Sequence, residues 1–411
     1  MLKSLTKINL TTQIFIGMAL GIAAGALFGE GILPLANPLA DLFLRLLKMI
    51  IVPLIITSII SGVTGVGGAG SLGRMGIKTL AYYVTTSMLA ILTGQLLVNI
   101  ISPGVGAELG LQSQPQAVDA SDQSLFGILL RMIPVNPIEA MAEGQILPII
   151  FFCILFGIFM IQLEGKKREG LQNLFEAGFE VMMKLTGFVI ALAPLGVFGL
   201  IARIVATTGF EPFKSLGIYF ITVVAALIIH AVITLPLLLK LLGKLSATKY
   251  VKAMSPALMT AFSTSSSSAT LPLTLECAEN RAGISNRTTS FVMPLGATIN
   301  MDGTALYECV AVIFIAQAYG IDLTMPQQAM VAITALLASI GAAGIPMAGL
   351  VMMSIVLKAV GLPLEGIGLI LAVDRLLDMC RTTVNVWSDS CGTAIIGRSE
   401  GETEILQERS E

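Results

Sequence analysis

Apolar segments long enough to cross a lipid bilayer recur along most of this chain, and they limit its fold more than any other feature. They lie near residues 10–33, 38–67, 78–102, 145–164, 172–207, 213–243, 286–319 and 363–397. About 20 apolar residues in a helix cross a hydrocarbon core of about 30 Å, so the longer segments are expected to tilt. Hydrophobic residues make up 55% of the chain and charged residues only 12%. We therefore predict an all-α polytopic membrane protein with eight transmembrane helices.

The ends and loops of these segments predict how the chain is oriented. The segment near 10–33 is expected to be the first membrane helix and not a signal peptide, because no clear small-residue cleavage site follows it. Basic residues fall in the loops that an inside N-terminus makes cytoplasmic: Arg74, Lys78, Lys166, Lys167, Arg168, Lys240, Lys244, Lys249 and Lys252. The opposite side carries acidic residues such as Glu108 and Asp119, with Lys214 as an exception. The positive-inside rule then predicts a multi-pass protein of the cell (inner) membrane with both termini cytoplasmic.

Composition also argues against several classes of function. The formal net charge of −2 offers no basic patch, so nucleic acid is not expected as a partner. The five cysteines have no CxxC spacing and the chain has a single histidine, which argues against a disulfide framework or a metal cluster. The sequence has no Walker A pattern and no nucleophile and base in a catalytic arrangement. We expect neither an enzyme nor a bound cofactor.

Two apolar segments, 250–279 and 326–357, are interrupted in the middle. The first is broken by a run of serines at 265–268, and the second by Gly-Ala-Ala-Gly-Ile-Pro at 341–346. Each half has about 12 residues and is about 18 Å long as a helix, which is too short to cross the membrane. We predict two re-entrant helical hairpins that enter from opposite sides. Each precedes a full span, so the two units form an inverted repeat of the kind that builds transporter binding sites.

The span before the second hairpin contains a weak point at 294–304, Pro-Leu-Gly-Ala-Thr-Ile-Asn-Met-Asp-Gly-Thr. Gly, Asn and Asp are poor helix formers, so the helix is expected to unwind here and to free backbone carbonyls. Carbonyls beside a buried carboxylate suit a dehydrated alkali cation. The hairpin tips expose backbone N–H groups at helix N-termini, which attract anions. Cation and anion sites are therefore expected side by side.

A polar stripe interrupts the last apolar segment. At about 100° per residue, one face of a single helix carries all of its members. They are Asp374, Asp378, Arg381, Thr382, Asn385 and Asp389. Ionisable groups at membrane depth cost a few kcal/mol each, at least, unless they pair, line a wet cavity or hold a charged ligand. A structural ion-pair network, with Asp378 and Arg381 satisfying each other, is the alternative to a binding site.

Four other residues receive a limited expectation or none. Glu308 lies in an apolar helix beyond Asp302, where it is either a proton carrier or a neutral hydrogen-bonded group. His230 also lies in an apolar helix and is expected to be a packed or interfacial residue and not a relay. No role is predicted for Trp387, the only tryptophan, or for Arg375.

The motifs SSSSATLP (265–272), GATINMDGTALYE (296–308), ASIGAAGIPMAG (338–349) and VDRLLDMCRTTVN (373–385) resemble those of the dicarboxylate/amino acid:cation symporters. This family includes archaeal aspartate transporters and animal excitatory amino acid transporters. The resemblance implies the glutamate-transporter fold, a homotrimer in the lipid bilayer and an elevator mechanism. The implied parts are scaffold helices 1–2 (1–73), helix 3 of the transport domain (74–102), scaffold helices 4–5 (103–210), the remaining transport domain (211–400) and a cytoplasmic tail (401–411). Helix 6, hairpin 1 (250–279), helix 7 (286–319), hairpin 2 (326–357) and helix 8 (363–397) make up that transport domain.

The resemblance also implies site residues. Arg381 would bind the side-chain carboxylate of an acidic amino acid and Asp378 its ammonium group, roles that a guanidinium fork and a carboxylate acceptor fit chemically. Further substrate contacts would come from Ser266, Ser267, Met301, Thr304, Ile345, Gly349, Thr382 and Asn385. One sodium site would use Asp389 with Gly296, Asn300 and Asn385. A second would use Thr298, Ser339 and Ile340. A third would use Tyr83, Thr86, Ser87, Asn300 and Asp302.

These expectations together predict a secondary active symporter that imports L-glutamate or L-aspartate with sodium. Asp378 and Arg381 favour an acidic amino acid, since family members for dicarboxylates tend to lack the first and neutral amino acid carriers lack the second. Glu308 adds the hypothesis of proton coupling. The alternatives are a proton- or sodium-coupled carrier of C4-dicarboxylates and a mainly channel-like anion pathway.

Overall fold

The structure, a computed structural model, describes residues 10–66, 73–107, 133–209, 211–340 and 348–406. Every regular element within these ranges is helical, which confirms the all-α prediction. The first half of the chain forms α2 (Leu10–Phe28), η1 (Gly29–Ile32), α3 (Leu33–Val66), α4 (Gly73–Ile101), α6 (Pro137–Glu143), α7 (Ile146–Ile161), α8 (Gly165–Ala191) and α9 (Ala193–Thr208). The second half forms α10 (Glu211–Ile229), η3 (His230–Thr234), α11 (Leu235–Leu241), α12 (Ala247–Thr264), α13 (Ser267–Glu276), η4 (Cys277–Arg281), α14 (Asn286–Ile299), α15 (Asp302–Ala318), α16 (Met325–Ile340), α17 (Ala348–Ala359), η5 (Leu364–Gly366) and α18 (Ile367–Ser399).

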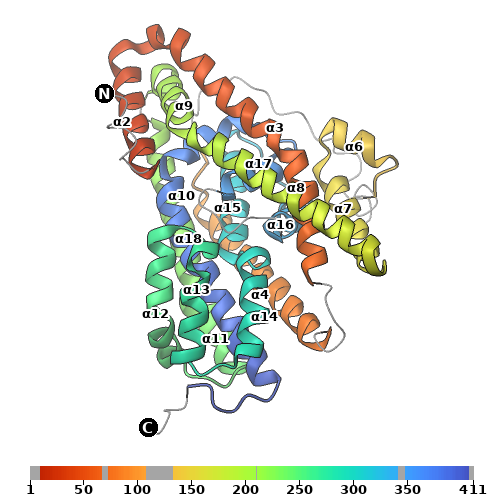
Figure 1. The fold of residues 1–411 in the computed structure, drawn as a ribbon. Helices are drawn as coiled ribbons and strands as arrows, with labels where there is room; N and C mark the ends of the chain where they lie inside the picture. Colours follow the sequence, from red (N-terminus) through yellow and green to blue (C-terminus); the bar gives the residue numbers. More distant parts are fainter. Residues whose placement is uncertain (1–9, 67–72, 108–132, 210, 341–347, 407–411) are drawn as a thin grey trace, which may run out of the picture.

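Most helices of the first half, apart from α4, pack mainly on one another. α2 lies against α9, and α3 contacts α7, α8 and α9. The α2–α9 contact is close because a Cβ on Gly21 would stand 2.8 Å from the Phe198 carbonyl oxygen. Small residues allow helix backbones to approach in this way in membranes. Figure 1 shows α3 and α8 as long helices that run obliquely across one side of the molecule.

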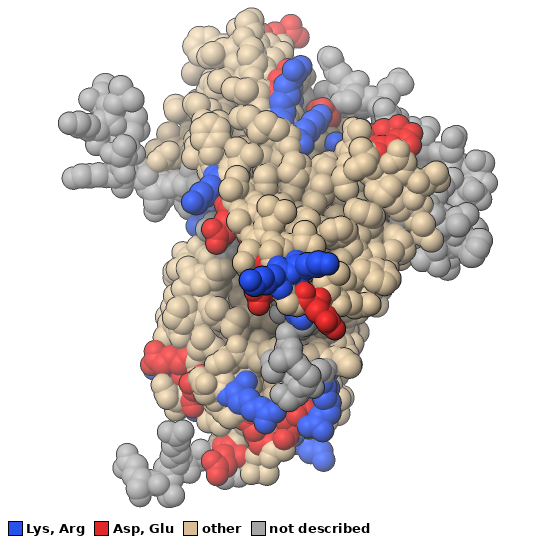
Figure 2. Space-filling model, turned by 45° about the vertical axis from the view of Figure 1, so that its right-hand side comes forward, with Lys and Arg blue, Asp and Glu red and all other residues tan. Residues whose placement is uncertain are grey.

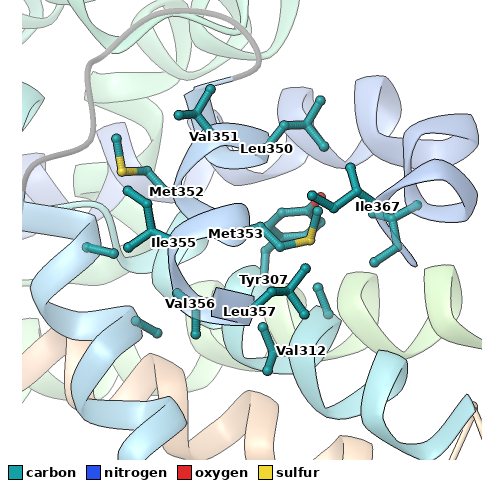
Figure 3. Packing of buried hydrophobic residues seen from close by; sticks show 14 of the residues in the cluster. Tyr307, Val312, Leu350, Val351, Met352, Met353, Ile355, Val356, Leu357 and Ile367 are labelled. Carbon is teal, nitrogen blue, oxygen red and sulfur yellow. The ribbon is translucent and has the colours of Figure 1, made fainter. Parts of the chain in front are cut away.

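α15 is the central helix of the second half. It is buried from Asp302 to Ala316 and is surrounded by α4, α10, α16, α17 and α18. Figure 3 shows Tyr307 and Val312 of α15 among side chains of α17, with Ile367 of α18 beside them. Because α15 is enclosed, any charged group on it lies away from lipid and from bulk water. Its N-terminal end, with Asp302, is therefore a protected place for an ion.

The first interrupted segment has the expected break. α12 ends at Thr264, Ser265 is left-handed with φ of 51°, and α13 begins at Ser267. The Ser266 side chain caps α13 by accepting a hydrogen bond from the Ala269 N–H at 3.1 Å, as serine commonly does. α12 packs on α13, and α16 packs on α17. The expected second break at 341–346 lies outside the described residues.

The predicted weak point between α14 and α15 is confirmed. Only Asn300 and Met301 separate the two helices, and both have non-helical backbone angles. Asn300 and Met301 are buried. The break therefore places unwound backbone inside the protein, where it is tolerated because it is shielded from lipid.

Not every expected span is a single helix that is long and apolar enough to cross a membrane. Four stretches of the described residues are long and apolar enough to cross a membrane: Thr12–Thr64, Arg74–Ile101, Lys214–Leu241 and Asn286–Ala318. The expected span 172–207 is divided between α8 and α9, which are bent by 48°. Pro194 in the first turn of α9 explains the break, since proline cannot donate the N–H that would continue the preceding helix. That the chain has eight transmembrane spans therefore remains a prediction.

Charged groups on the surface gather mainly towards the end of the molecule that carries the C-terminus, with broad uncharged areas elsewhere on the face shown in Figure 2. At this end Glu400 accepts hydrogen bonds from Arg74 at 2.8 Å and from Lys78 at 2.6 Å. Glu402 accepts two more from Ser285, through its N–H at 2.9 Å and its hydroxyl at 2.6 Å. Residues after α18 therefore tie α4 and the start of α14 together.

The hydrogen bonds of Glu400 with Arg74 and Lys78 predict that the stability of the fold depends on pH. Hydrogen bonds from Arg74, and then from Lys78, lower the pKa of Glu400 to about 2, against about 4.3 in an unfolded chain. A lowered carboxylate pKa stabilises the fold above about pH 4, and that contribution is lost as the pH falls towards 2. We expect a small loss of thermal stability between pH 5 and pH 3 that Glu400→Gln reduces, measured by unfolding in detergent. An unchanged pH dependence in the variant would contradict this interpretation.

Candidate binding site

The polar stripe of the last helix is buried in the interior of the protein. Asp374, Asp378, Arg381, Thr382, Asn385 and Asp389 all belong to α18 and are at most 5% exposed. α18 packs against α10, α12, α14 and α15, which explains the burial. The predicted single polar face is therefore present, and it points into the protein and not into lipid.

Arg381 is held by two carboxylates of its own helix. Its Nη1 lies 3.1 Å from Asp374 Oδ1, and its Nη2 donates to Asp378 Oδ1 at 2.8 Å. The guanidinium also stacks on Tyr307 of α15, with Cζ 3.8 Å from the ring centroid. The Tyr307 hydroxyl donates to Asp374 Oδ1 at 2.8 Å. Tyr307 and Asp374 thus fix one side of Arg381.

Asp378 has a more adaptable environment than Asp374. Besides Arg381 it pairs with Arg375, whose Nη1 lies 3.2 Å from Asp378 Oδ2. Arg375 is partly exposed, with 13% of its side chain accessible. If Asp378 exchanged a guanidinium for a ligand ammonium, Arg381 would keep its contact with Asp374. Buried charges require such compensation, because an unpaired one costs several kcal/mol.

The second hairpin approaches Arg381 closely. A Cβ on Gly349, at the start of α17, would stand 2.8 Å from Arg381 Nη1. Any larger residue at this position would require the guanidinium to shift. The predicted substrate residue Ile345 lies outside the described residues. Gly349 is therefore the part of this hairpin that the structure brings to Arg381.

Asn385 connects α18 to the break before α15. Its Oδ1 accepts a hydrogen bond from the Gly303 N–H at 2.8 Å, and its Nδ2 donates to Thr304 Oγ1 at 3.2 Å. The same amide nitrogen lies 3.7 Å from Met301 Sδ. Three predicted substrate residues are thus brought together. Ser266 and Ser267 are also buried, in the hairpin whose second helix contacts α18.

Two residues of the first predicted sodium site, Gly296 and Asn300, lie against Asp389, whereas Asn385 contacts Gly303 and Thr304 instead. Asn300 Nδ2 donates to Asp389 Oδ1 at 2.9 Å. A Cβ on Gly296 would stand 2.5 Å from the same oxygen and 2.8 Å from the Tyr83 hydroxyl. Glycine at this position allows α14 to approach both groups.

Residues of the third predicted site meet on the other side of Asn300. Ser87 of α4 donates to Asp302 Oδ1 at 2.7 Å, and Thr86 donates to Asn300 Oδ1 at 3.4 Å. The Tyr83 hydroxyl donates to the Val292 carbonyl at 2.7 Å. The side chains of all five predicted residues are buried. Asn300 lies between the two sites, since its amide nitrogen faces Asp389 and its oxygen faces α4.

The second predicted sodium site has a more open setting. Thr298 and Ile340 line one cavity of about 360 Å³, between α3, α8, α14 and α16. Ser339 is buried and donates to the Leu336 carbonyl at 2.8 Å. The structure therefore brings these residues to neighbouring positions without a shared hydrogen bond among the described residues.

Four residues of this region received no role from the sequence. Tyr307 and Asp374 contact Arg381, whereas Ser388 and His230 contact Asp302. Ser388 donates to Asp302 Oδ2 at 2.6 Å and accepts from Asn300 Nδ2 at 3.0 Å. His230 Nε2 lies 3.1 Å from the same Asp302 oxygen. His230 was expected to be packed or interfacial; it is buried and packed, and its polar contact with Asp302 was not foreseen.

Glu308 lies one helical turn and a half beyond Asp302 and is fully buried. Among the described residues neither of its carboxylate oxygens has a hydrogen-bond partner. A buried polar group without a partner is costly, and a buried charge is much more so. The expectation that Glu308 is a neutral hydrogen-bonded group therefore finds no partner for it among the described residues.

A helical chain with a buried acidic and basic site around unwound backbone defines an integral membrane transport protein. Residues 10–399 match the sodium:dicarboxylate symporter family, and the chain belongs to that family. It is therefore a transporter and not an enzyme.

Relatives come from bacteria and animals. The chain is 37% identical to a proton/glutamate-aspartate symporter of Escherichia coli (strain K12), over 96% of this chain and 93% of the relative. It is 38% identical to excitatory amino acid transporter 3 of Mus musculus, over 90% and 80% of the two chains. It is 36% identical to a proton/sodium-glutamate symport protein of Geobacillus stearothermophilus, over 96% of each.

Proposed function

We propose that this chain is a secondary active symporter that imports an acidic amino acid, glutamate or aspartate, together with sodium. The observation that carries the proposal is the buried Arg381, flanked by Asp374 and Asp378 and approached by Gly349. Arginine binds carboxylates bidentately, and a carboxylate accepts from an ammonium group. The names of the relatives support this substrate class, and they include both sodium and proton coupling.

The proposed cation sites would lie close to the proposed substrate site. Asn385 reaches Gly303 and Thr304, and Asp302 begins the same helix α15. Asp302 and Asp389 are buried carboxylates without a paired cationic Lys or Arg among the described residues. Cations bound there would offset their charge before an anionic substrate is enclosed. We infer that this electrostatic order couples the two fluxes, and that substrate should not close the second hairpin without sodium.

The larger architecture is part of the proposal. The chain would have eight spans and two re-entrant hairpins arranged as inverted repeats. Residues 1–73 and 103–210 would form the scaffold of a homotrimer in the cell (inner) membrane, with both termini cytoplasmic. Residues 74–102 and 211–400 would move against it as an elevator, with the second hairpin as the extracellular gate and 401–411 as a cytoplasmic tail. Breaks at Ser265 and at Asn300 support this, because irregular backbone at membrane depth usually lines a site.

Uptake into proteoliposomes tests the proposed activity. Labelled aspartate and glutamate should accumulate against their gradients when an inward sodium gradient is imposed, and uptake should saturate. A proton gradient alone, applied without sodium, separates proton coupling from sodium coupling. Preference for succinate or fumarate would favour the dicarboxylate carrier, and ohmic flux without accumulation would favour a channel.

Glu308 carries a separate prediction about protons. Its two oxygens lack partners in a fully buried position, so a proton is the simplest way to remove its charge. If this proton is co-transported, Glu308→Gln should make sodium-driven uptake much less dependent on external pH than in the unsubstituted protein. Initial uptake rates between pH 5.5 and 8.5 measure this. A pH dependence that survives unchanged would end the proton hypothesis without affecting sodium coupling.

A further inference from the structure

The carboxylate of Asp302 is held by three donors from three separate elements. Ser87 of α4 donates to Oδ1, whereas Ser388 of α18 and His230 of η3 contact Oδ2. An ionised carboxylate has about four lone-pair directions. Three are occupied here, and the remaining one is on Oδ1. The free direction therefore lies on the oxygen that faces α4, beside Ser87.

The tautomer of His230 follows from its surroundings. The side chain is fully buried, and its Nδ1 has no hydrogen-bond partner in the part of the chain that the structure describes. A proton on Nδ1 would leave an unpaired donor and would direct the Nε2 lone pair at a carboxylate oxygen. A proton on Nε2 satisfies both atoms of the contact. His230 is therefore assigned as the donor, from Nε2 to Asp302.

A local helix irregularity brings His230 to this position. Pro236 has no N–H, so the α10–α11 helix cannot form its regular bond there. The helix widens into the π-turn η3 just before it, where the Leu235 N–H donates to the His230 carbonyl five residues back. The Ala231 carbonyl, which Leu235 would contact in a regular helix, instead accepts from Trp387 Nε1 at 3.0 Å. The only tryptophan thus joins the widened turn to α18.

We propose that His230 is a positioning residue for the cation site at Asp302. By donating to Oδ2 it fixes the rotation of the carboxylate, so that the free lone pair of Oδ1 is presented beside Ser87. Partners that orient a metal ligand in this way typically change affinity by about 10- to 100-fold when they are removed. The inference rests on the proposed sodium coupling and adds a residue to that site.

Sodium binding to the purified, detergent-solubilised protein tests the proposal without transport. The sodium concentration that gives half of the maximal thermal stabilisation, with no amino acid present, should rise about tenfold or more in His230→Ala. His230→Gln, whose amide nitrogen reaches a position close to Nε2, should restore most of the affinity. Trp387→Phe removes the donor to Ala231 and should give a smaller rise. Aspartate affinity at saturating sodium should change little.

Thr222→Val is the matched control. Thr222 lies on the same helix and is fully buried, but its hydroxyl donates only to the Ile218 carbonyl. It should leave the sodium response unchanged. A normal response in folded His230→Ala, or an equal defect in His230→Gln and His230→Ala, would overturn the role of His230. No sodium response in the unsubstituted protein would overturn sodium coupling itself, and this inference with it.

Discussion

Replacing Arg381 with alanine is expected to remove the affinity for acidic amino acids while sodium binding persists. The substitution deletes the proposed partner of the substrate carboxylate and leaves Asp374 and Asp378 without their shared cation. Truncating one member of a buried charge pair costs about 2–5 kcal/mol. At 1.4 kcal/mol per factor of ten, affinity should fall by about 30-fold or more. Aspartate-induced and sodium-induced thermal stabilisation, measured separately, check the two halves of this prediction.

Controls for Arg381 distinguish charge from geometry. Arg381→Lys keeps the charge but loses the planar fork and the stacking on Tyr307, so it should also bind aspartate poorly. Arg203→Ala removes an arginine whose pair with Asp41 lies on other helices, α9 and α3, and should leave aspartate binding intact. Full aspartate affinity in a folded Arg381→Ala protein would remove Arg381 from the substrate site.

Replacing Asp389 with asparagine keeps the shape of the side chain but removes its charge, and it should weaken sodium binding strongly. A unit charge about 4 Å from a cation contributes roughly 4 kcal/mol at an effective dielectric constant of 20. Part of that energy offsets desolvation, so we expect the sodium concentration for half-maximal uptake to rise about tenfold or more. Uptake of labelled aspartate at graded sodium concentrations, with constant ionic strength, measures the shift.

Two further variants sharpen the test of Asp389. Gly296→Ala leaves every charge in place, but its methyl group would overlap Asp389 Oδ1 and crowd the Tyr83 hydroxyl. It should therefore reduce sodium affinity through geometry alone. Asp322→Asn removes an exposed carboxylate just after α15 and should have no effect. Unchanged sodium dependence in folded Asp389→Asn would exclude Asp389 as a sodium ligand.

Sequence reasoning located most of the breaks in the fold because they are local. Serine at 265–268 and the Asn-Met-Asp-Gly run at 300–303 oppose helix formation wherever they occur, and the structure interrupts its helices at both places. The bend between α8 and α9 carries a local signal too, in Pro194, but an apolar stretch of adequate length concealed it. Span counts depend on continuous length, which a single kink changes.

The periodicity of the sequence could not predict contacts between distant segments. Tyr307 meets Arg381, and Ser388 meets Asn300, only because α15 is enclosed by its neighbours. His230 had an indirect signal in Pro236, six residues later, yet no rule of spacing links a widened turn in one helix to a carboxylate in another. Such pairs arise from how helices pack, which sums many weak contacts over the whole molecule.

The sequence by itself determined that the chain is helical and apolar, that it is broken at defined points, and that six polar residues share one face of its last helix. These features follow from backbone preferences and from the 3.6-residue turn, which act within a single segment. Tertiary structure alone decided that Arg381 stacks on Tyr307, that Asn300 joins Asp389 to Ser388, and that His230 faces Asp302. The physical reason is that buried charges must be matched by whichever groups packing brings near, and packing is a property of all helices together.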